Sequence, residues 1–152
     1  LKGTSVKLTK DQLIEDAHAR SYKDDLGYYI PGLALKTCIC FGGKRVKVGR
    51  SAASAQLRAI LHADEKVYLD PQYSPQIEEG CVQMPPASGK RVVKYWVSFP
   101  QWCVSFVGTI LDDRFPPAAI HTSAKEAGLY YGLLDGRPEH GRFMVSGFRV
   151  VE

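Results

Sequence analysis

The sequence predicts an α+β fold in which an antiparallel sheet of about five strands is covered by three helices. Segments rich in helix formers alternate with segments rich in β-branched and aromatic residues, in the order α-β-β-α-β-β-α-β. Short turns join the consecutive strand segments, which favours antiparallel pairing. The chain has 152 residues, 45% of them hydrophobic, so we expect residues 1–152 to form a single domain with its own core.

Capping residues and hydrophobic periodicity define the expected helices. Thr9 and Gln12 have the spacing of a capping box, in which each side chain bonds the backbone N–H of the other residue. Ser123 and Glu126 repeat that spacing, and Ser51 is a suitable N-cap for the alanine-rich segment that follows it. The helices are expected at residues 8–24, 51–64 and 123–135.

The expected strands are segments with alternating or β-branched side chains. Residues 33–48 predict a β-hairpin, because apolar side chains alternate along them and Gly42 and Gly43 suit a two-residue turn. One face of this hairpin is apolar, and the other carries Lys36, Cys38, Cys40, Arg45 and Lys47. Further strands are expected at 91–99, 102–111 and 142–151, and a proline-rich loop at 70–89 with a short strand at 81–84.

The net charge of the chain indicates which classes of partner it can bind. A formal net charge of +4 and a pI near 8.9 permit a polyanionic partner, which we expect to be nucleic acid or an acidic protein surface. No membrane partner is expected, because no apolar run is long enough to span a bilayer.

The sequence lacks the motifs of phosphate-binding loops, zinc proteases and serine hydrolases, and we expect no cofactor. The oligomeric state is left open. Since the sequence begins at Leu1 and not at Met, we expect a processed or trimmed N-terminus.

The cysteines leave several chemistries open. They are Cys38, Cys40, Cys81 and Cys103. Their spacing is not that of a disulfide framework or a zinc site, so we expect reduced thiols, no bound metal and a cytoplasmic setting. Cys103 is expected on a strand and half-buried, where no helix N-terminus lowers its pKa. A cysteine-dependent hydrolase would need His121 or His140 as its base. A redox-sensing pair at Cys38 and Cys40, or half of a metal site there, also stays open.

Clustered basic residues support the leading functional hypothesis, a small soluble non-catalytic binding or regulatory domain. The expected binding residues are Lys36, Lys44, Arg45, Lys47 and Arg50 on the hairpin and its exit, and Lys90 and Arg91 in a second basic run. Aromatic residues near basic ones are one means of binding single-stranded nucleic acid. Tyr95 and Trp96 are adjacent on one strand and point to opposite faces, so they cannot both serve one platform.

A second hypothesis is a metal-independent, toxin-like ribonuclease. His121 and His140 would act as general acid and base, and Lys125 would stabilise the charge of the transition state. The two histidines flank opposite ends of the helix expected at 123–135, so the loop before His140 would have to fold back for them to meet.

Overall fold

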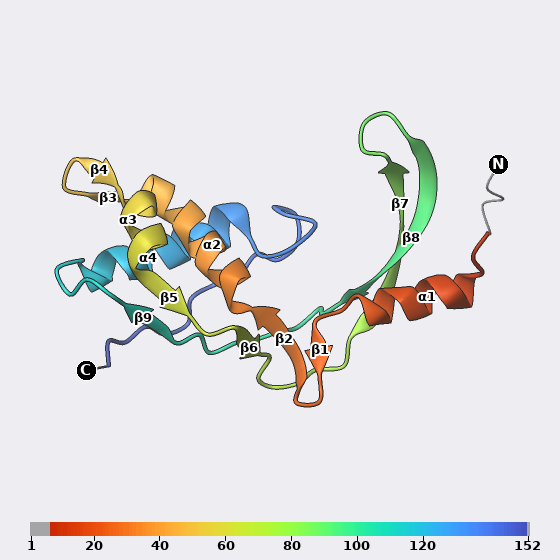
Figure 1. Cartoon of the computed structure of the whole chain (residues 1–152), viewed down its shortest axis with the longest axis horizontal. Coiled ribbons are helices and arrows are strands. Elements are labelled where there is room, and N and C mark those ends of the chain that lie inside the picture. Colours follow the sequence, from red (N-terminus) through yellow and green to blue (C-terminus); the bar gives the residue numbers. More distant parts are fainter. Residues whose placement is uncertain (1–6, 152) are drawn as a thin grey trace. The chain divides into compact units, whose positions relative to one another are not determined.

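The computed structural model describes residues 7–151 and shows an α+β fold (Figure 1). The helices are α1 (Lys10–Ala19), α2 (Gly32–Gly42), the 3-10 helix η1 (Gly43–Arg45), α3 (Ala53–Ile60), α4 (Pro117–Glu126) and the π-helix η2 (Ala127–Tyr131). The strands are β1 (Lys23–Asp24), β2 (Gly27–Pro31), β3 (Lys47–Val48), β4 (Ser51–Ala52), β5 (Leu61–Ala63), β6 (Lys66–Tyr68), β7 (Gln76–Met84), β8 (Lys90–Ser98) and β9 (Gly108–Ile110). Among these described residues, no helix has the length and apolar character needed to cross a bilayer.

The strands form several small antiparallel sheets, so the prediction of one five-stranded sheet is wrong. One sheet has the order β1-β2-β6, and the other strands pair as β3-β4, β5-β9 and β7-β8. The difference has a local origin: the segment expected to supply two strands of the sheet, residues 33–48, forms a helix over most of its length. The remaining strands, apart from those of the β7-β8 ladder, are too short to build one continuous sheet.

The chain divides into two compact units. The first contains the described residues up to Tyr29 together with Tyr68–Val104. The second contains Ile30–Val67 and the described residues from Ser105 onward.

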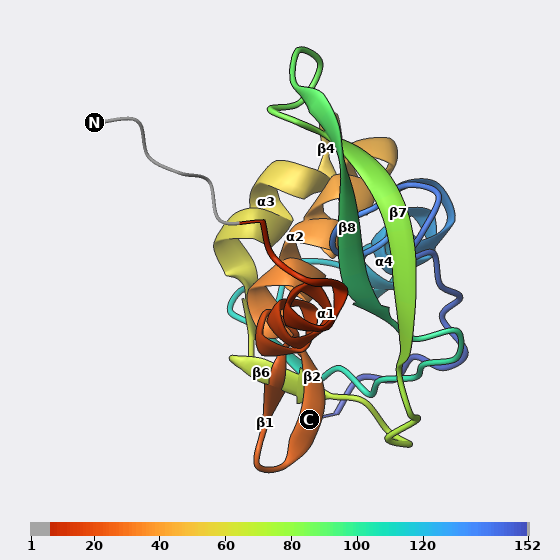
Figure 2. The ribbon, with the colours of Figure 1, turned by 90° about the vertical axis from the view of Figure 1, so that its right-hand side faces the viewer.

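In the first unit, α1 begins at the capping box that the sequence predicts. Gln12 N donates to Thr9 Oγ1 at 3.3 Å, and Thr9 N donates to Gln12 Oε1 at 2.9 Å. A cap of this kind stabilises a helix by about 1 kcal/mol. The helix buries Ala17 and lies beside β8, where Lys10 Nζ is 6.0 Å from the centre of the Tyr95 ring (Figure 2). The helix is shorter than the predicted range of 8–24.

The β7-β8 ladder is the longest paired segment among the described residues, with nine residues in each strand. It confirms the strand expected at 91–99, whereas β7 occupies much of the segment expected to be a loop at 70–89. Trp96 lies across the backbone of Gly80, where an added Cβ would come within 2.4 Å of the indole. Trp96 Nε1 donates to Glu78 Oε2 at 3.0 Å, which holds the ring in that place.

In the second unit, residues 32–42 form α2, so the β-hairpin prediction is wrong. Buried residues of this segment recur with a helical spacing of three or four residues: Leu35, Cys38, Ile39 and Gly42. Leu33, which the hairpin would place on its apolar face, is 71% exposed. A short apolar run fits either period, and here the contacts of α2 with α3, α4 and η2 decide in favour of the helix (Figure 1).

Gly42 belongs to this helix and not to a turn, since its φ is −57°. A Cβ at Gly42 would lie 1.9 Å from the carbonyl oxygen of Ser123 and 2.6 Å from the backbone nitrogen of Ala127. The second unit therefore uses this glycine to bring α2 and the end of α4 into backbone contact.

The core of the second unit joins these helices to β5. Its buried members are Ile39, Cys40, Ala53, Leu57, Leu61, Phe115 and Ala119. Ser123 is fully buried in the middle of α4, where its Oγ donates to Ala119 O at 2.7 Å. The second predicted capping box is therefore wrong, because α4 begins at Pro117, six residues before Ser123.

Three more expectations are wrong in whole or in part. The N-cap of α3 is Ala52, without a side-chain hydrogen bond, and Ser51 lies in β4. Of the strand expected at 102–111, only β9 (Gly108–Ile110) and an isolated bridge at Val104 form. Residues 142–151 are not a strand.

Candidate functional site

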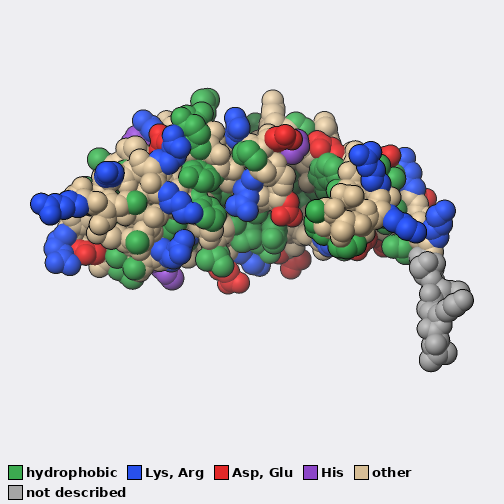
Figure 3. Space-filling view, turned by 90° about the horizontal axis from the view of Figure 1, so that it is seen from above, with side chains coloured by type: hydrophobic (Ala, Val, Ile, Leu, Met, Phe, Trp, Pro, Cys, Tyr) green, Lys and Arg blue, Asp and Glu red, His purple; other side chains and the backbone are tan. Residues whose placement is uncertain are grey.

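The structure places the predicted basic residues on several different elements. In the second unit Lys36 lies on α2, Lys44 and Arg45 in η1, Lys47 in β3 and Arg50 in the turn before β4. Figure 3 shows Lys and Arg side chains over this part of the second unit. Lys90 and Arg91 open β8 in the first unit. The hairpin that was expected to bring the first five residues together does not form, because α2 replaces it.

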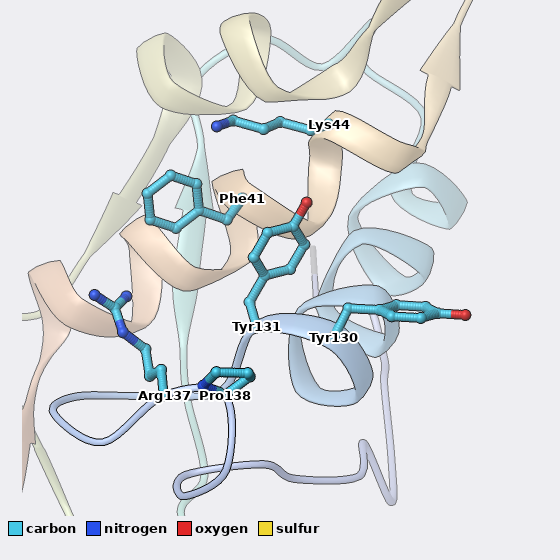
Figure 4. Close-up of a pocket in the computed structure, with 6 residues that line it drawn as sticks. All are labelled: Phe41, Lys44, Tyr130, Tyr131, Arg137 and Pro138. Carbon is cyan, nitrogen blue, oxygen red and sulfur yellow. The ribbon is translucent and has the colours of Figure 1, made fainter.

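A pocket of about 410 Å³ lies beside Lys44, entirely within the second unit. Its lining residues are Phe41, Lys44, Tyr130, Tyr131, Arg137 and Pro138 (Figure 4). Three aromatic rings and two cationic side chains therefore share one concave surface. We therefore take this pocket as the candidate binding site of the second unit.

Local structure explains why these residues meet. Phe41 stands in the last turn of α2, and η1 follows directly, so Lys44 comes back over the same helix end. On the other side, η2 ends at Gly132, whose φ of +74° lets the chain reverse. The reversed segment is held by Leu133 N donating to Gly141 O at 2.9 Å. That turn carries Arg137 and Pro138 to the rim of the pocket.

The rings are ordered by contacts with one another and with cations. Phe41 and Tyr131 are nearly parallel, with ring centres 5.8 Å apart and an angle of 17° between the planes. Lys44 Nζ lies 4.6 Å from the centre of the Phe41 ring, within cation–π range. The aromatic surface and its positive charge are therefore parts of one arrangement.

Arg45 is held differently from Lys44 and Arg137. Its Nε donates to Glu126 Oε2 at 2.8 Å, and its guanidinium carbon lies 3.9 Å from the centre of the Tyr130 ring. The hydrogen bond to Glu126 raises the pKa of Arg45. Among residues 7–151, neither Lys44 nor Arg137 has a carboxylate partner. The pocket therefore carries two positive charges that no carboxylate of the described chain neutralises.

Cys38 and Cys40 are buried on α2 and are not on an outer face as predicted. Cys38 Sγ donates to Gly132 O at 3.1 Å, and burial raises the pKa of the Cys38 thiol to about 11, although the charge of Arg137 acts in the opposite direction. Burial likewise raises the pKa of Cys40, against the charges of Lys36 and Arg58. The nearby cations do not produce thiolates here, because desolvation outweighs them.

Of the other two cysteines, Cys103 differs from expectation, whereas Cys81 lies in β7, which includes the short strand expected at 81–84. Cys103 is exposed and not half-buried, and its backbone oxygen accepts from Asp70 N at 2.9 Å. Cys81 is exposed on β7. All four are free thiols, and no group of three His, Cys, Asp or Glu side chains suited to a metal ion occurs among the described residues.

The residues of the ribonuclease hypothesis lie on two segments of the second unit. His121 is on α4, stacked on Phe148 with ring centres 4.7 Å apart and an angle of 8°. Lys125 is one turn further along the same face of α4, and His140 lies in the turn after η2. Within the described chain, no hydrogen bond or ring contact joins His121 to His140 or Lys125. Their joint action stays a prediction.

Five of the six pocket residues were not among the site residues predicted from the sequence: Phe41, Tyr130, Tyr131, Arg137 and Pro138. The adjacent Tyr130 and Tyr131 were the available signal, since a tyrosine offers a partner both an apolar ring and a polar hydroxyl group. Comparisons with models of protein families, with curated proteins and with solved structures found no match for this chain. A functional assignment therefore rests on the chemistry of the pocket and its surroundings.

Proposed function

We propose that the second unit is a non-catalytic module that binds single-stranded nucleic acid. The observation that carries this proposal is the union of three aromatic rings with two cations that have no carboxylate partner in the described chain, all around one open pocket. Proteins that bind single strands combine positive charge, which attracts the phosphates, with aromatic rings on which bases stack.

The surroundings of the pocket extend its positive charge along the chain. Arg45 adjoins Lys44 in η1, and the exposed Lys47 and Arg50 follow on the β3-β4 hairpin. A strand whose base enters the pocket would have its neighbouring phosphates near these side chains. Such contacts add affinity without sequence preference and make it depend on salt.

The rings favour nucleic acid over an acidic protein surface as the partner. Carboxylates of a protein would engage Lys44 and Arg137 but would leave the faces of Phe41 and Tyr131 unused. Unpaired bases use both features, because every base has a flat face and each nucleotide carries a phosphate. A double helix, in contrast, keeps its bases stacked on one another and offers no free face to the pocket.

Fluorescence anisotropy with labelled oligouridylate and oligothymidylate tests the proposal. Lys44→Glu should weaken binding roughly tenfold, since it removes one charge and adds a repulsive one beside the rings. It should also flatten the dependence of affinity on salt. Arg114→Glu is the matched control, because Arg114 is an exposed cation of the same unit whose partner is Asp112 and which does not line the pocket.

Two results would contradict the proposal. One is an absence of strand binding by the wild-type protein at low salt. The other is equal weakening by Lys44→Glu and Arg114→Glu, which would mean that only the overall charge of the protein matters. A labelled acidic peptide of similar length tests an acidic protein surface as the partner, and tighter binding of that peptide than of the strand would favour such a surface.

A further inference from the structure

We propose that the pocket holds one internal nucleotide of the strand, with its base on the Phe41 and Tyr131 rings and its two flanking phosphates beside Lys44 and Arg137. This inference rests on the proposed function and adds to it the ligand's size, its charge pattern and its position within the strand.

The size of the pocket fits a single nucleotide. Its volume of about 410 Å³ is near the lower end of the range for small-molecule sites, roughly 300–1,000 Å³. A pocket of this size accommodates one base with its sugar, and the rest of the strand must remain outside. The neighbouring nucleotides would therefore be recognised only through their phosphates and the exposed cations around the rim.

The rings offer the base a prepared surface. Phe41 and Tyr131 differ by only 17° in orientation, so a flat ligand beside them can lie parallel to both rings. Figure 4 shows both rings face on, whereas the Tyr130 side chain points away from them. The Arg45 guanidinium lies 3.9 Å from the centre of the Tyr130 ring and Lys44 Nζ lies 4.6 Å from the centre of the Phe41 ring, so a cation adjoins each of these two rings. The orientation of Tyr130, away from Phe41 and Tyr131 in Figure 4, separates it from the surface that those two rings share. The base is thus assigned to Phe41 and Tyr131.

The cations lie at two ends of this surface. In Figure 4 the ammonium group of Lys44 and the guanidinium group of Arg137 are on opposite sides of the Phe41 ring. A ligand that covers the rings would meet one positive charge at each end. An internal nucleotide has this pattern, since its sugar carries one phosphate on the 5′ side and another on the 3′ side. A nucleotide with a single phosphate would use only one of the two charges.

The lack of carboxylate partners for Lys44 and Arg137 among the described residues supports their assignment to phosphates. Arg20, Arg45 and Arg114 each form an ion pair with a carboxylate. Lys44 and Arg137 have no such partner among residues 7–151, although both line the pocket. The charge of Arg137 also reaches the buried Cys38, where it lowers the thiol pKa against the larger effect of burial. Two positive charges near an apolar ring surface are stabilised when an anion joins them.

Competition against labelled oligouridylate tests this inference with four probes: uridine, uridine 5′-monophosphate, uridine 3′-monophosphate and uridine 3′,5′-bisphosphate. In the wild-type protein each phosphate should improve binding, and the bisphosphate should bind roughly a hundredfold more tightly than uridine, about tenfold for each charge-assisted contact. Lys44→Met and Arg137→Met remove one charge each from exposed positions, so neither should unfold the protein.

The decisive result is a crossed pattern between variants and probes. Lys44→Met should abolish the advantage of one monophosphate over uridine and keep that of the other, and Arg137→Met should do the reverse. Equal losses for both monophosphates in both variants would show a diffuse electrostatic attraction and would overturn the inference. Arg114→Met serves as the control that should leave all four affinities unchanged.

The outcomes separate this inference from the proposed function. If oligouridylate binds but the bisphosphate does not compete, the strand is bound outside the pocket, so the inference fails and the proposed function stands. If the bisphosphate binds but no strand does, the pocket serves a free nucleotide, and both the inference and the proposed function fail. Binding of neither probe also overturns both. Tyr131→Leu provides a further check, because it should weaken all four probes, uridine included, if the base lies on this ring.

Discussion

Replacement of Gly42 by alanine tests the packing on which the second unit and its pocket depend. The added Cβ would lie 1.9 Å from the carbonyl oxygen of Ser123 and 2.6 Å from the backbone nitrogen of Ala127. Ordinary contact begins near 3.4 Å, so the two backbones must separate by about 1.5 Å or the new methyl group cannot fit. Neither contact atom belongs to a flexible side chain, so the structure cannot relax by a change of rotamer.

The expected loss of stability follows from two opposing effects. Overpacking of a close contact costs about 1–3 kcal/mol, and more when backbone must move. Alanine is favoured over glycine in a helix by about 1 kcal/mol, which offsets part of that cost. We therefore expect Gly42→Ala to lower the free energy of unfolding by about 2 kcal/mol. The affinity of the pocket for oligouridylate should fall as well, since Phe41 precedes Gly42 and Tyr131 follows Ala127.

Urea unfolding followed by circular dichroism measures this change. Gly147→Ala is the control, because a Cβ there has nothing within 4 Å and the residue has no left-handed backbone angle. The control should lie within about 0.5 kcal/mol of the wild type. A Gly42→Ala protein as stable as the control would refute the close contact between α2 and α4, and with it the placement of residues 32–42 in a helix against that contact.

Three further predictions concern the thiols and the histidines. At pH 8, iodoacetamide should modify the exposed Cys81 and Cys103 and spare Cys38, whose pKa is about 11. Because that pKa is raised above the ordinary value of 9.0, the stability that the neutral Cys38 thiol contributes is complete below pH 9 and is lost as the pH rises towards 11. Cys38→Ala should therefore make stability less dependent on pH in that window, and an unchanged dependence would speak against a buried thiol. The ribonuclease hypothesis predicts that the wild-type protein degrades RNA in EDTA and that His121→Ala and His140→Ala each abolish this degradation. Intact RNA after incubation with the wild-type protein would reject that hypothesis.

Two local signals in the sequence correctly predicted local structure. The capping box of Thr9 and Gln12 forms as expected, because both hydrogen bonds join groups only three residues apart. The β-branched run within 91–99 forms β8 for a similar reason, since it has few helix formers to compete with its strand propensity. Such features depend little on what the rest of the chain does.

Where the sequence of a segment fits two conformations, contacts with distant parts of the chain determine which one forms. Residues 33–41 alternate in polarity and also repeat apolar side chains at helical spacing, so that their sequence fits both structures. The same ambiguity misplaced Ser123, which has the composition of a cap but lies inside α4 and bonds back to Ala119. In both places the long-range packing of helices selected among locally acceptable conformations.

Some residues of the candidate site could be predicted from the sequence, and others could not. Lys44 and Arg45 were identified from the sequence, because clustered cations can be recognised along the chain. Phe41 lies in the segment for which the sequence predicts a hairpin, and Tyr131 and Arg137 lie about ninety residues further on. Their meeting depends on the contact of α2 with η2 and on the chain reversal at Gly132. Sequence spacing carries no signal of such a meeting.

The sequence by itself determined the α+β class, the start of the first helix and the excess of positive charge, because these follow from composition and from hydrogen bonds between near neighbours. The tertiary structure decided that α2 is a helix, that Gly42 serves a backbone contact and that aromatic rings join Lys44 and Arg137 in one pocket. The physical reason is that burial and close packing act between residues distant in sequence. Their free energy outweighs the small differences in local preference that the sequence displays.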